Sequence, residues 1–190
     1  MKLFKNIKKW LENQEHLFYL FLFILIVPNI VLCFTEPLSF IAKVCNVLLP
    51  FGCYYLLMTL SRNCGKTLWI LFLFLFFGAF QIVLLYLFGQ SIIAVDMFLN
   101  LVTTNSSEAL ELLDNLTPAI IAVIILYVPA LILGTISIVR KRKLTAEFIR
   151  RERKRASIVF GISLLSLVGA YVQDSGYELK SDLYPLNVCY

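Results

Sequence analysis

The sequence predicts an all-α, polytopic membrane protein with five transmembrane helices and additional periplasmic interfacial helices. The first observation is composition: 60% of the 190 residues are hydrophobic and only 15% are charged. Soluble domains carry about 45–50% apolar and about 25% charged residues. The second is that the chain contains five long apolar segments, each close to the roughly 20 residues that cross a bilayer core. The third is that the basic residues gather beside only some of these segments.

The five apolar segments are joined mostly by short polar turns, and no internal repeat or linker divides the chain. The first one follows a basic stretch as a signal peptide would, but no small-residue cleavage pattern comes after it, so we expect it to be retained. The expected spans are Leu17–Phe34, Leu38–Leu60, Thr67–Phe88, Pro118–Val139 and Ala156–Val172. An amphipathic cytoplasmic lead-in over residues 1–16 precedes this five-span domain of residues 17–172, and residues 173–190 follow it.

Charge predicts the orientation of these spans. The loop 140–155 holds nine Lys or Arg against two Glu, and the N-terminal arm adds four lysines. By contrast, the segment 90–117 has four acidic residues and no basic one, and the tail 173–190 has three acidic residues against one lysine. Because basic loops stay in the cytoplasm, we expect a cytoplasmic N-terminus and an external C-terminus. The same rule explains the net charge of +5 without a nucleic acid partner.

A few isolated residues bear on function. The five cysteines lack the C-x-x-C spacing of a zinc or redox site. The single histidine, His16, falls at the cytoplasmic end of the first span and is expected to be an interfacial polar residue. Lys43 falls inside the second span, where its ammonium either reaches outward to the interface or faces the bundle and neutralises a phosphate.

The segment 90–117 is the longest connection in the chain, and long ordered loops are often functional. We expect it to form helices at the periplasmic interface. On one helix, Asn100, Thr104 and Glu108 would align at i, i+4 and i+8, presenting an amide, a hydroxyl and a carboxylate that suit a lipid headgroup. The alternative is structural, because Asn105 followed by Glu108 has the spacing of a capping box.

These residues resemble a known family. Met97, Asn100, Thr104 and Glu108 match the Met-x-x-Asn-x-x-x-Thr-x-x-x-Glu pattern that follows the third span in bacterial lipid A phosphoethanolamine transferases, which include the mobile colistin-resistance enzymes. The five-span plan, the basic loop between the fourth and fifth spans, and the tail Tyr184–Asn187 are also similar. The resemblance places the chain in the bacterial inner membrane.

The resemblance implies a membrane domain that precedes a periplasmic catalytic domain of the alkaline-phosphatase type. Such enzymes move phosphoethanolamine from phosphatidylethanolamine to lipid A, using a threonine nucleophile and zinc. Asn100, Thr104 and Glu108 would then bind the donor. This chain has one histidine and no set of zinc ligands on the outer side, so we expect no cofactor in it. Zinc is expected in the missing domain, and residues 173–190 are expected to start the bridge toward it.

Two other interpretations stay open. One is a related transferase with a different acceptor, such as a core sugar or a surface glycan. The other is a non-enzymatic membrane scaffold or small transport-like subunit, which predicts no following catalytic domain. A transporter would also need polar residues along a path through its spans. The only clear polar residues for such a path are Asn29, Lys43, Asn46 and Gln81.

Overall fold

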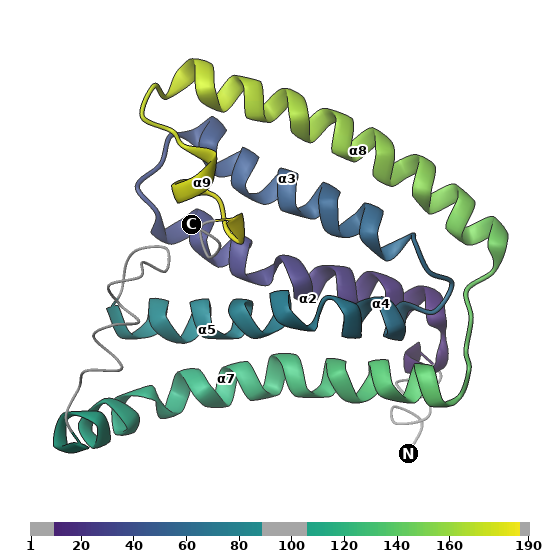
Figure 1. Ribbon diagram of the computed structural model, residues 1–190, viewed down its shortest axis with the longest axis horizontal. Helices are drawn as coiled ribbons and strands as arrows, with labels where there is room; N and C mark the ends of the chain where they lie inside the picture. Colours follow the sequence, from purple (N-terminus) through teal and green to yellow (C-terminus); the bar gives the residue numbers. More distant parts are fainter. Residues whose placement is uncertain (1–9, 89–105, 187–190) are drawn as a thin grey trace.

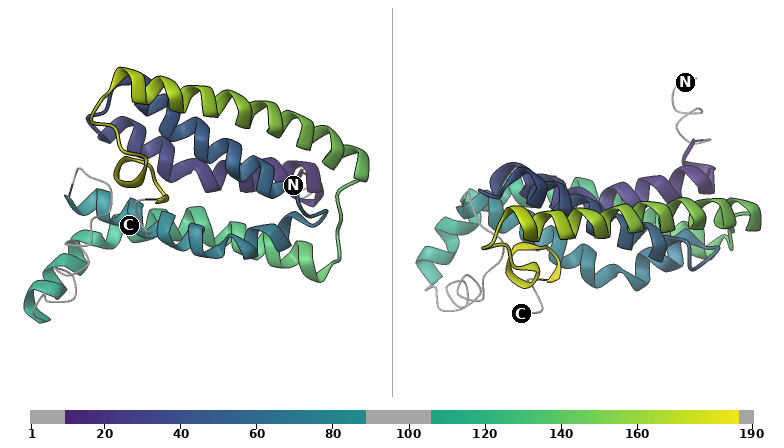
Figure 2. Two further views of the ribbon diagram at one scale, coloured as in Figure 1. Left: turned by 45° about the horizontal axis from the view of Figure 1, so that its top comes forward. Right: turned by 90° about the horizontal axis from the view of Figure 1, so that it is seen from above.

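The computed structural model describes residues 10–88 and 106–186, and every regular element in these ranges is a helix. This confirms the all-α class. Helix α8 packs on α3, α3 on α2, and α5 and α7 pack on each other and on α2 (Figure 1; Figure 2). The elements are α2 (Gln14–Thr35), α3 (Phe40–Met58), α4 (Cys64–Ile70), α5 (Phe72–Phe88), α7 (Ser106–Val139), α8 (Ala146–Gln173) and α9 (Leu179–Asp182).

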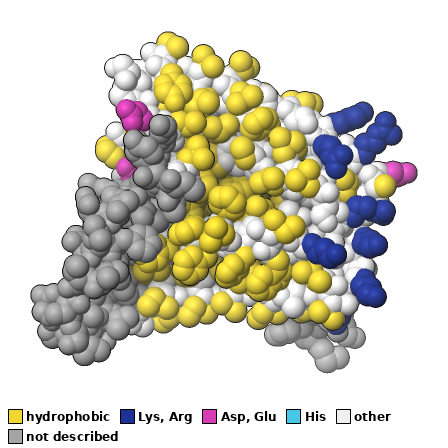
Figure 3. Space-filling view, viewed as in Figure 1, with side chains coloured by type: hydrophobic (Ala, Val, Ile, Leu, Met, Phe, Trp, Pro, Cys, Tyr) yellow, Lys and Arg dark blue, Asp and Glu magenta, His cyan; other side chains and the backbone are white. Residues whose placement is uncertain are grey.

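The helices have transmembrane character. Helices α2, α3, α7 and α8 each contain a stretch long and apolar enough to cross a membrane, and α4 with α5 supplies a fifth if this bent pair is one span. Large apolar side chains also cover the outside of the bundle (Figure 3). Ile125, Leu165 and Val172 are 68%, 72% and 82% exposed. Contiguous apolar surface of this kind suits hydrocarbon rather than water.

Polar side chains define where the helices start. The residue before each of α2, α3, α4 and α8 accepts a hydrogen bond from a backbone N–H of the first turn, which otherwise has no partner in the helix. Those capping residues are Asn13, Ser39, Asn63 and Thr145. The predicted turn between the first two spans is confirmed, since α2 ends at Thr35 and α3 begins at Phe40.

Three predicted boundaries differ from the structure. Helix α7 continues through Pro118, where we expected a short helix and then a separate span. Proline removes only one backbone donor, and an apolar helix tolerates it. Helix α8 begins at Ala146, ten residues before the expected span, because Thr145 caps it within the basic loop. The expected third span is broken at Leu71, and its two parts meet at an angle of 63°.

Two glycines bring α4 against α7 at the bend. A Cβ atom added to Gly65 would collide with the backbone carbonyl group of Gly134, and one added to Gly134 would lie 3.1 Å from Leu68 Cδ2. Small residues permit this close backbone approach between apolar helices. The contact holds α4 on α7, and beyond the bend at Leu71 helix α5 also packs on α7.

Candidate functional site

The two ends of the bundle differ in charge. We call one the basic end: it comprises the start of α2, the α3–α4 turn, the α7–α8 connection and the first turns of α8. Its Lys and Arg side chains form a group at one edge of the molecule (Figure 3). The opposite end, which we call the tail end, carries the α2–α3 turn, the end of α5, the start of α7 and the segment 174–186.

Only part of the predicted donor site falls within the described residues. Asn100 and Thr104 lie outside them, as does the proposed cap Asn105. Glu108 is the third residue of α7, whose backbone is described there. The chain between α5 and α7 is therefore attached to the bundle at the tail end.

Segment 174–186, which we call the tail, folds back onto the bundle (Figure 1; Figure 2). Asn46 of α3 contacts it twice. Its Nδ2 donates to the carbonyl oxygen of Asp182 at 2.5 Å, and its Oδ1 accepts from the Tyr177 hydroxyl at 2.6 Å. Tyr177 is 2% exposed, and burial raises the pKa of its hydroxyl, which stays protonated and able to donate.

A second pair of contacts fixes the end of the tail. Asn29 of α2 donates from Nδ2 to the carbonyl oxygen of Tyr184 at 2.7 Å. The Tyr184 side chain is 1% exposed, and its hydroxyl donates to the carbonyl oxygen of Phe74 in α5 at 3.2 Å. Gly78 of α5 lies beside this hydroxyl and packs closely against α2 and α7, since a Cβ there would lie 2.9 Å from Pro28 Cγ and 3.2 Å from the Tyr127 hydroxyl. The tail is thus held by α2, α3 and α5 together.

These contacts change the interpretation of two polar residues. Asn29 and Asn46 were the clearest signs of a polar path through the spans, but both amides bind the tail. They are 1% and 6% exposed, so burial explains why a bonded partner is needed. Sequence reasoning missed the tail as their partner. The usable signal was two lone asparagines in apolar segments, which need a donor or acceptor from elsewhere in the chain.

Lys43 lies close to the tail end. It belongs to the first turn of α3, where its backbone N–H donates to the carbonyl oxygen of Ser39, and it is half-buried. Both predicted roles of its ammonium, reaching outward to the interface or facing the bundle, stay predictions.

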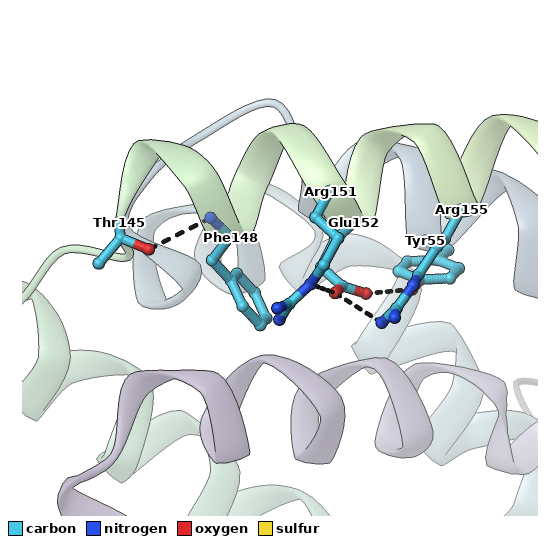
Figure 4. A network of polar contacts seen from close by, with 6 residues as sticks. All are labelled: Tyr55, Thr145, Phe148, Arg151, Glu152 and Arg155. Carbon is cyan, nitrogen blue, oxygen red and sulfur yellow. Dashed lines mark hydrogen bonds and ion pairs between the residues drawn. The ribbon is translucent and has the colours of Figure 1, made fainter.

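A buried carboxylate joins α8 to α3 at the basic end (Figure 4). Glu152 is fully buried, and its Oε2 accepts from the Tyr55 hydroxyl at 2.5 Å. Its Oε1 accepts from Arg151 at 2.9 Å and from Arg155 at 3.0 Å. All of these groups are engaged with one another, so the network is a structural clamp rather than a reactive site.

The described ranges contain no cluster of metal ligands. No three His, Cys, Asp or Glu side chains there lie close enough to hold a metal ion. His16 stacks on Trp10 with ring centroids 4.9 Å apart, as an interfacial side chain would. The chain matches no protein-family model, no curated protein and no solved structure.

Proposed function

We propose that this chain is the membrane domain of a phosphoethanolamine transferase that moves phosphoethanolamine from phosphatidylethanolamine to lipid A. The observation that carries the proposal is the position of one sequence motif. Glu108, the last residue of the pattern, is the third residue of α7, which starts at the tail end of the bundle (Figure 1). The docked tail lies at that same end.

The proposed orientation follows from charge. The basic end faces the cytoplasm and the tail end faces the periplasm, because Lys and Arg remain on the cytoplasmic side of a membrane. A count of five spans, with α4 and α5 taken as one bent span, supports opposite sides of the membrane for the two ends of the chain. The donor headgroup in the outer leaflet then meets the segment 89–108.

The donor site uses three groups of different chemistry. The carboxylate of Glu108 pairs with the primary ammonium of the ethanolamine headgroup, and Asn100 and Thr104 bind the phosphate or glycerol oxygens. A choline headgroup carries no N–H to donate and is larger, so this pairing selects ethanolamine. The alternative role of Glu108, as part of a helix cap, predicts no headgroup selection.

The transfer chemistry comes from a domain beyond these 190 residues, which we propose follows the tail. Phosphoryl transfer depends on holding donor and acceptor in line and on stabilising charge. Both lipids are confined to the bilayer, whereas a zinc-dependent domain works in water above it. The hydrogen bonds from Asn29 and Asn46 hold the tail on the bundle, which supports a fixed starting point for a domain that follows it.

The test is lipid A mass spectrometry from bacteria that carry or lack the full-length gene. The wild-type protein should add the mass of a phosphoethanolamine group to lipid A and raise polymyxin resistance. Glu108→Gln should lower the modified fraction by about tenfold or more, since a hydrogen bond between charged groups is worth about 1.5–3 kcal/mol. The matched control, Glu111→Gln, removes the same charge one turn later in α7 and should leave the modification unchanged.

Three results would each contradict part of the proposal. If the wild-type gene leaves lipid A unmodified and another surface glycan gains the group, the acceptor is different. If no glycan gains it, the chain is a scaffold or transport-like subunit instead. Full modification by Glu108→Gln would remove Glu108 from the donor site and leave it a helix-capping role.

A further inference from the structure

We propose that a cavity at the basic end binds the phosphate-bearing headgroup of an anionic phospholipid in the leaflet at that end. The proposal concerns the end of the bundle opposite the donor site. It therefore does not depend on the transferase function.

The cavity has a volume of about 680 Å³ and lies between the α3–α4 turn and the end of α7. Four cationic side chains line it, together with the hydroxyl-bearing Ser61 and the apolar Ile138. Two cations come from each side: Arg62 and Lys66 from the turn and α4, and Lys141 and Lys143 from the α7–α8 connection.

Hydrogen bonds hold the two sides of the cavity together. The Leu144 N–H donates to the carbonyl oxygen of Arg62 at 2.7 Å, and Arg62 Nε donates back to the carbonyl oxygen of Leu144 at 3.0 Å. The Asn63 amide donates to the carbonyl oxygens of Ser137 and Arg142 at 3.2 and 2.9 Å. The turn and the connection that carry the four cations are therefore held against each other, in part by the Arg62 side chain itself.

Lys141 occupies a backbone position that favours glycine. Its φ is +50°, and it follows the end of α7, where its N–H donates to Ile138 and the next N–H donates to Ser137. This is the hydrogen-bond pattern of a Schellman motif, in which glycine is the usual residue at this position. A lysine here accepts backbone strain and adds a positive charge to the cavity wall.

The cavity cations lack the partners that neighbouring arginines have. Arg140 and Arg142 lie 3.9 Å from the carboxylate of Glu12, and the arginines beside Glu152 bond to its carboxylate. Within the described residues, none of the four cavity cations forms an ion pair, and no acidic residue lines the cavity. Four unpaired cations in one cavity repel one another, and a bound anion relieves this repulsion.

The surroundings favour a lipid over a soluble phosphate. Ile138 lines the cavity, and the neighbouring Val139 is 73% exposed on the outside of α7. Ile70, at the end of α4, is 77% exposed. A headgroup in the cavity would let its acyl chains run along these apolar side chains, and basic pockets at helix ends in the cytoplasmic leaflet are suited to such lipids. A headgroup with two phosphates, as in cardiolipin, matches four cations best.

The experiment measures lipid affinity of the purified full chain in detergent by native mass spectrometry. Cardiolipin is the probe, phosphatidylethanolamine is the neutral comparison, and inorganic pyrophosphate is the soluble competitor. The double variant Lys141→Gln/Lys143→Gln should lower cardiolipin affinity by about tenfold or more. The control Arg150→Gln/Lys154→Gln removes two exposed cations from α8, outside the cavity, and should change it less than about threefold.

A second variant separates binding from folding. Lys141→Gly relieves the backbone strain at positive φ, so it should raise the melting temperature while it lowers cardiolipin affinity. Loss of binding through unfolding cannot produce both effects.

Three outcomes would overturn the proposal. Equal loss of cardiolipin binding in the two double variants would mean that only general surface charge matters. Cardiolipin binding no tighter than phosphatidylethanolamine binding would mean that the cavity does not recognise anionic headgroups. Displacement of cardiolipin by pyrophosphate at equal phosphate concentration would assign the cavity to soluble phosphates instead.

Discussion

Replacing Asn46 by leucine is expected to release the tail without unfolding the bundle. The change removes two hydrogen bonds, one to the carbonyl oxygen of Asp182 and one from the Tyr177 hydroxyl. Each buried hydrogen bond contributes about 1 kcal/mol net, so tail opening should become easier by about 2 kcal/mol. The open population of the tail then rises about 30-fold. Tyr177→Phe removes only one of these bonds and should raise it about fivefold.

The assay is hydrogen–deuterium exchange of peptides covering residues 174–186, with the protein in lipid nanodiscs. The local amides report opening, since the N–H groups of Tyr177 and Asp182 are bonded within the tail at 3.1 and 2.9 Å. Tyr86→Phe is the control, because Tyr86 is 55% exposed on α5 and should not affect the tail. If the tail of the Asn46→Leu variant exchanges no faster than the tail of the Tyr86→Phe control, the reasoning is refuted. An equal increase in exchange throughout α8 would show global unfolding instead.

Two further substitutions test how the helices are held together. Gly65→Ala places a methyl group against the Gly134 carbonyl, which cannot move aside, and should cost about 2 kcal/mol or more. In Gly161→Ala the added methyl group meets no atom within 4 Å, so this variant should be as stable as the wild type or more stable. If Gly65→Ala and Gly161→Ala show equal thermal stability in detergent, the close contact at Gly65 is contradicted. Tyr55→Phe removes the hydroxyl that donates to buried Glu152 and should lower stability by about 1.5–3 kcal/mol, also measured by thermal unfolding. An unchanged melting temperature would show that the clamp does not stabilise the bundle.

The sequence predicted most helices because apolar length alone determines them. The expected span Leu17–Phe34 corresponds to α2, Gln14–Thr35, and the difference at each end is three residues or fewer. The break at Leu71 was not predicted, because the residues there include neither proline nor glycine. Six residues before the break, Gly65 approaches the backbone of α7, and no local pattern contains such a tertiary contact. The docking of the tail was not predicted either, because it too depends on contacts between residues far apart in the sequence.

The sequence also predicted only part of the candidate site. Helical spacing and the family resemblance together proposed Asn100, Thr104 and Glu108, and these residues remain a proposal. The contacts of Asn29 with Tyr184 join residues 155 positions apart, so only the folded chain reveals them. The sequence did not predict the cavity at the basic end either. The composition of the basic loop indicated only its orientation. The grouping of its unpaired cations depends on how Leu144 and Arg62 bond across the turn.

The most direct test of the account is the side of the membrane on which each end of the bundle lies. With the five native cysteines replaced, single cysteines at Lys180 and Glu147 report the tail end and the basic end. In intact spheroplasts, a membrane-impermeant maleimide should label position 180, and position 147 should react only after permeabilisation. Labelling of position 147 alone in intact spheroplasts would put the donor motif in the cytoplasm and contradict the proposed function.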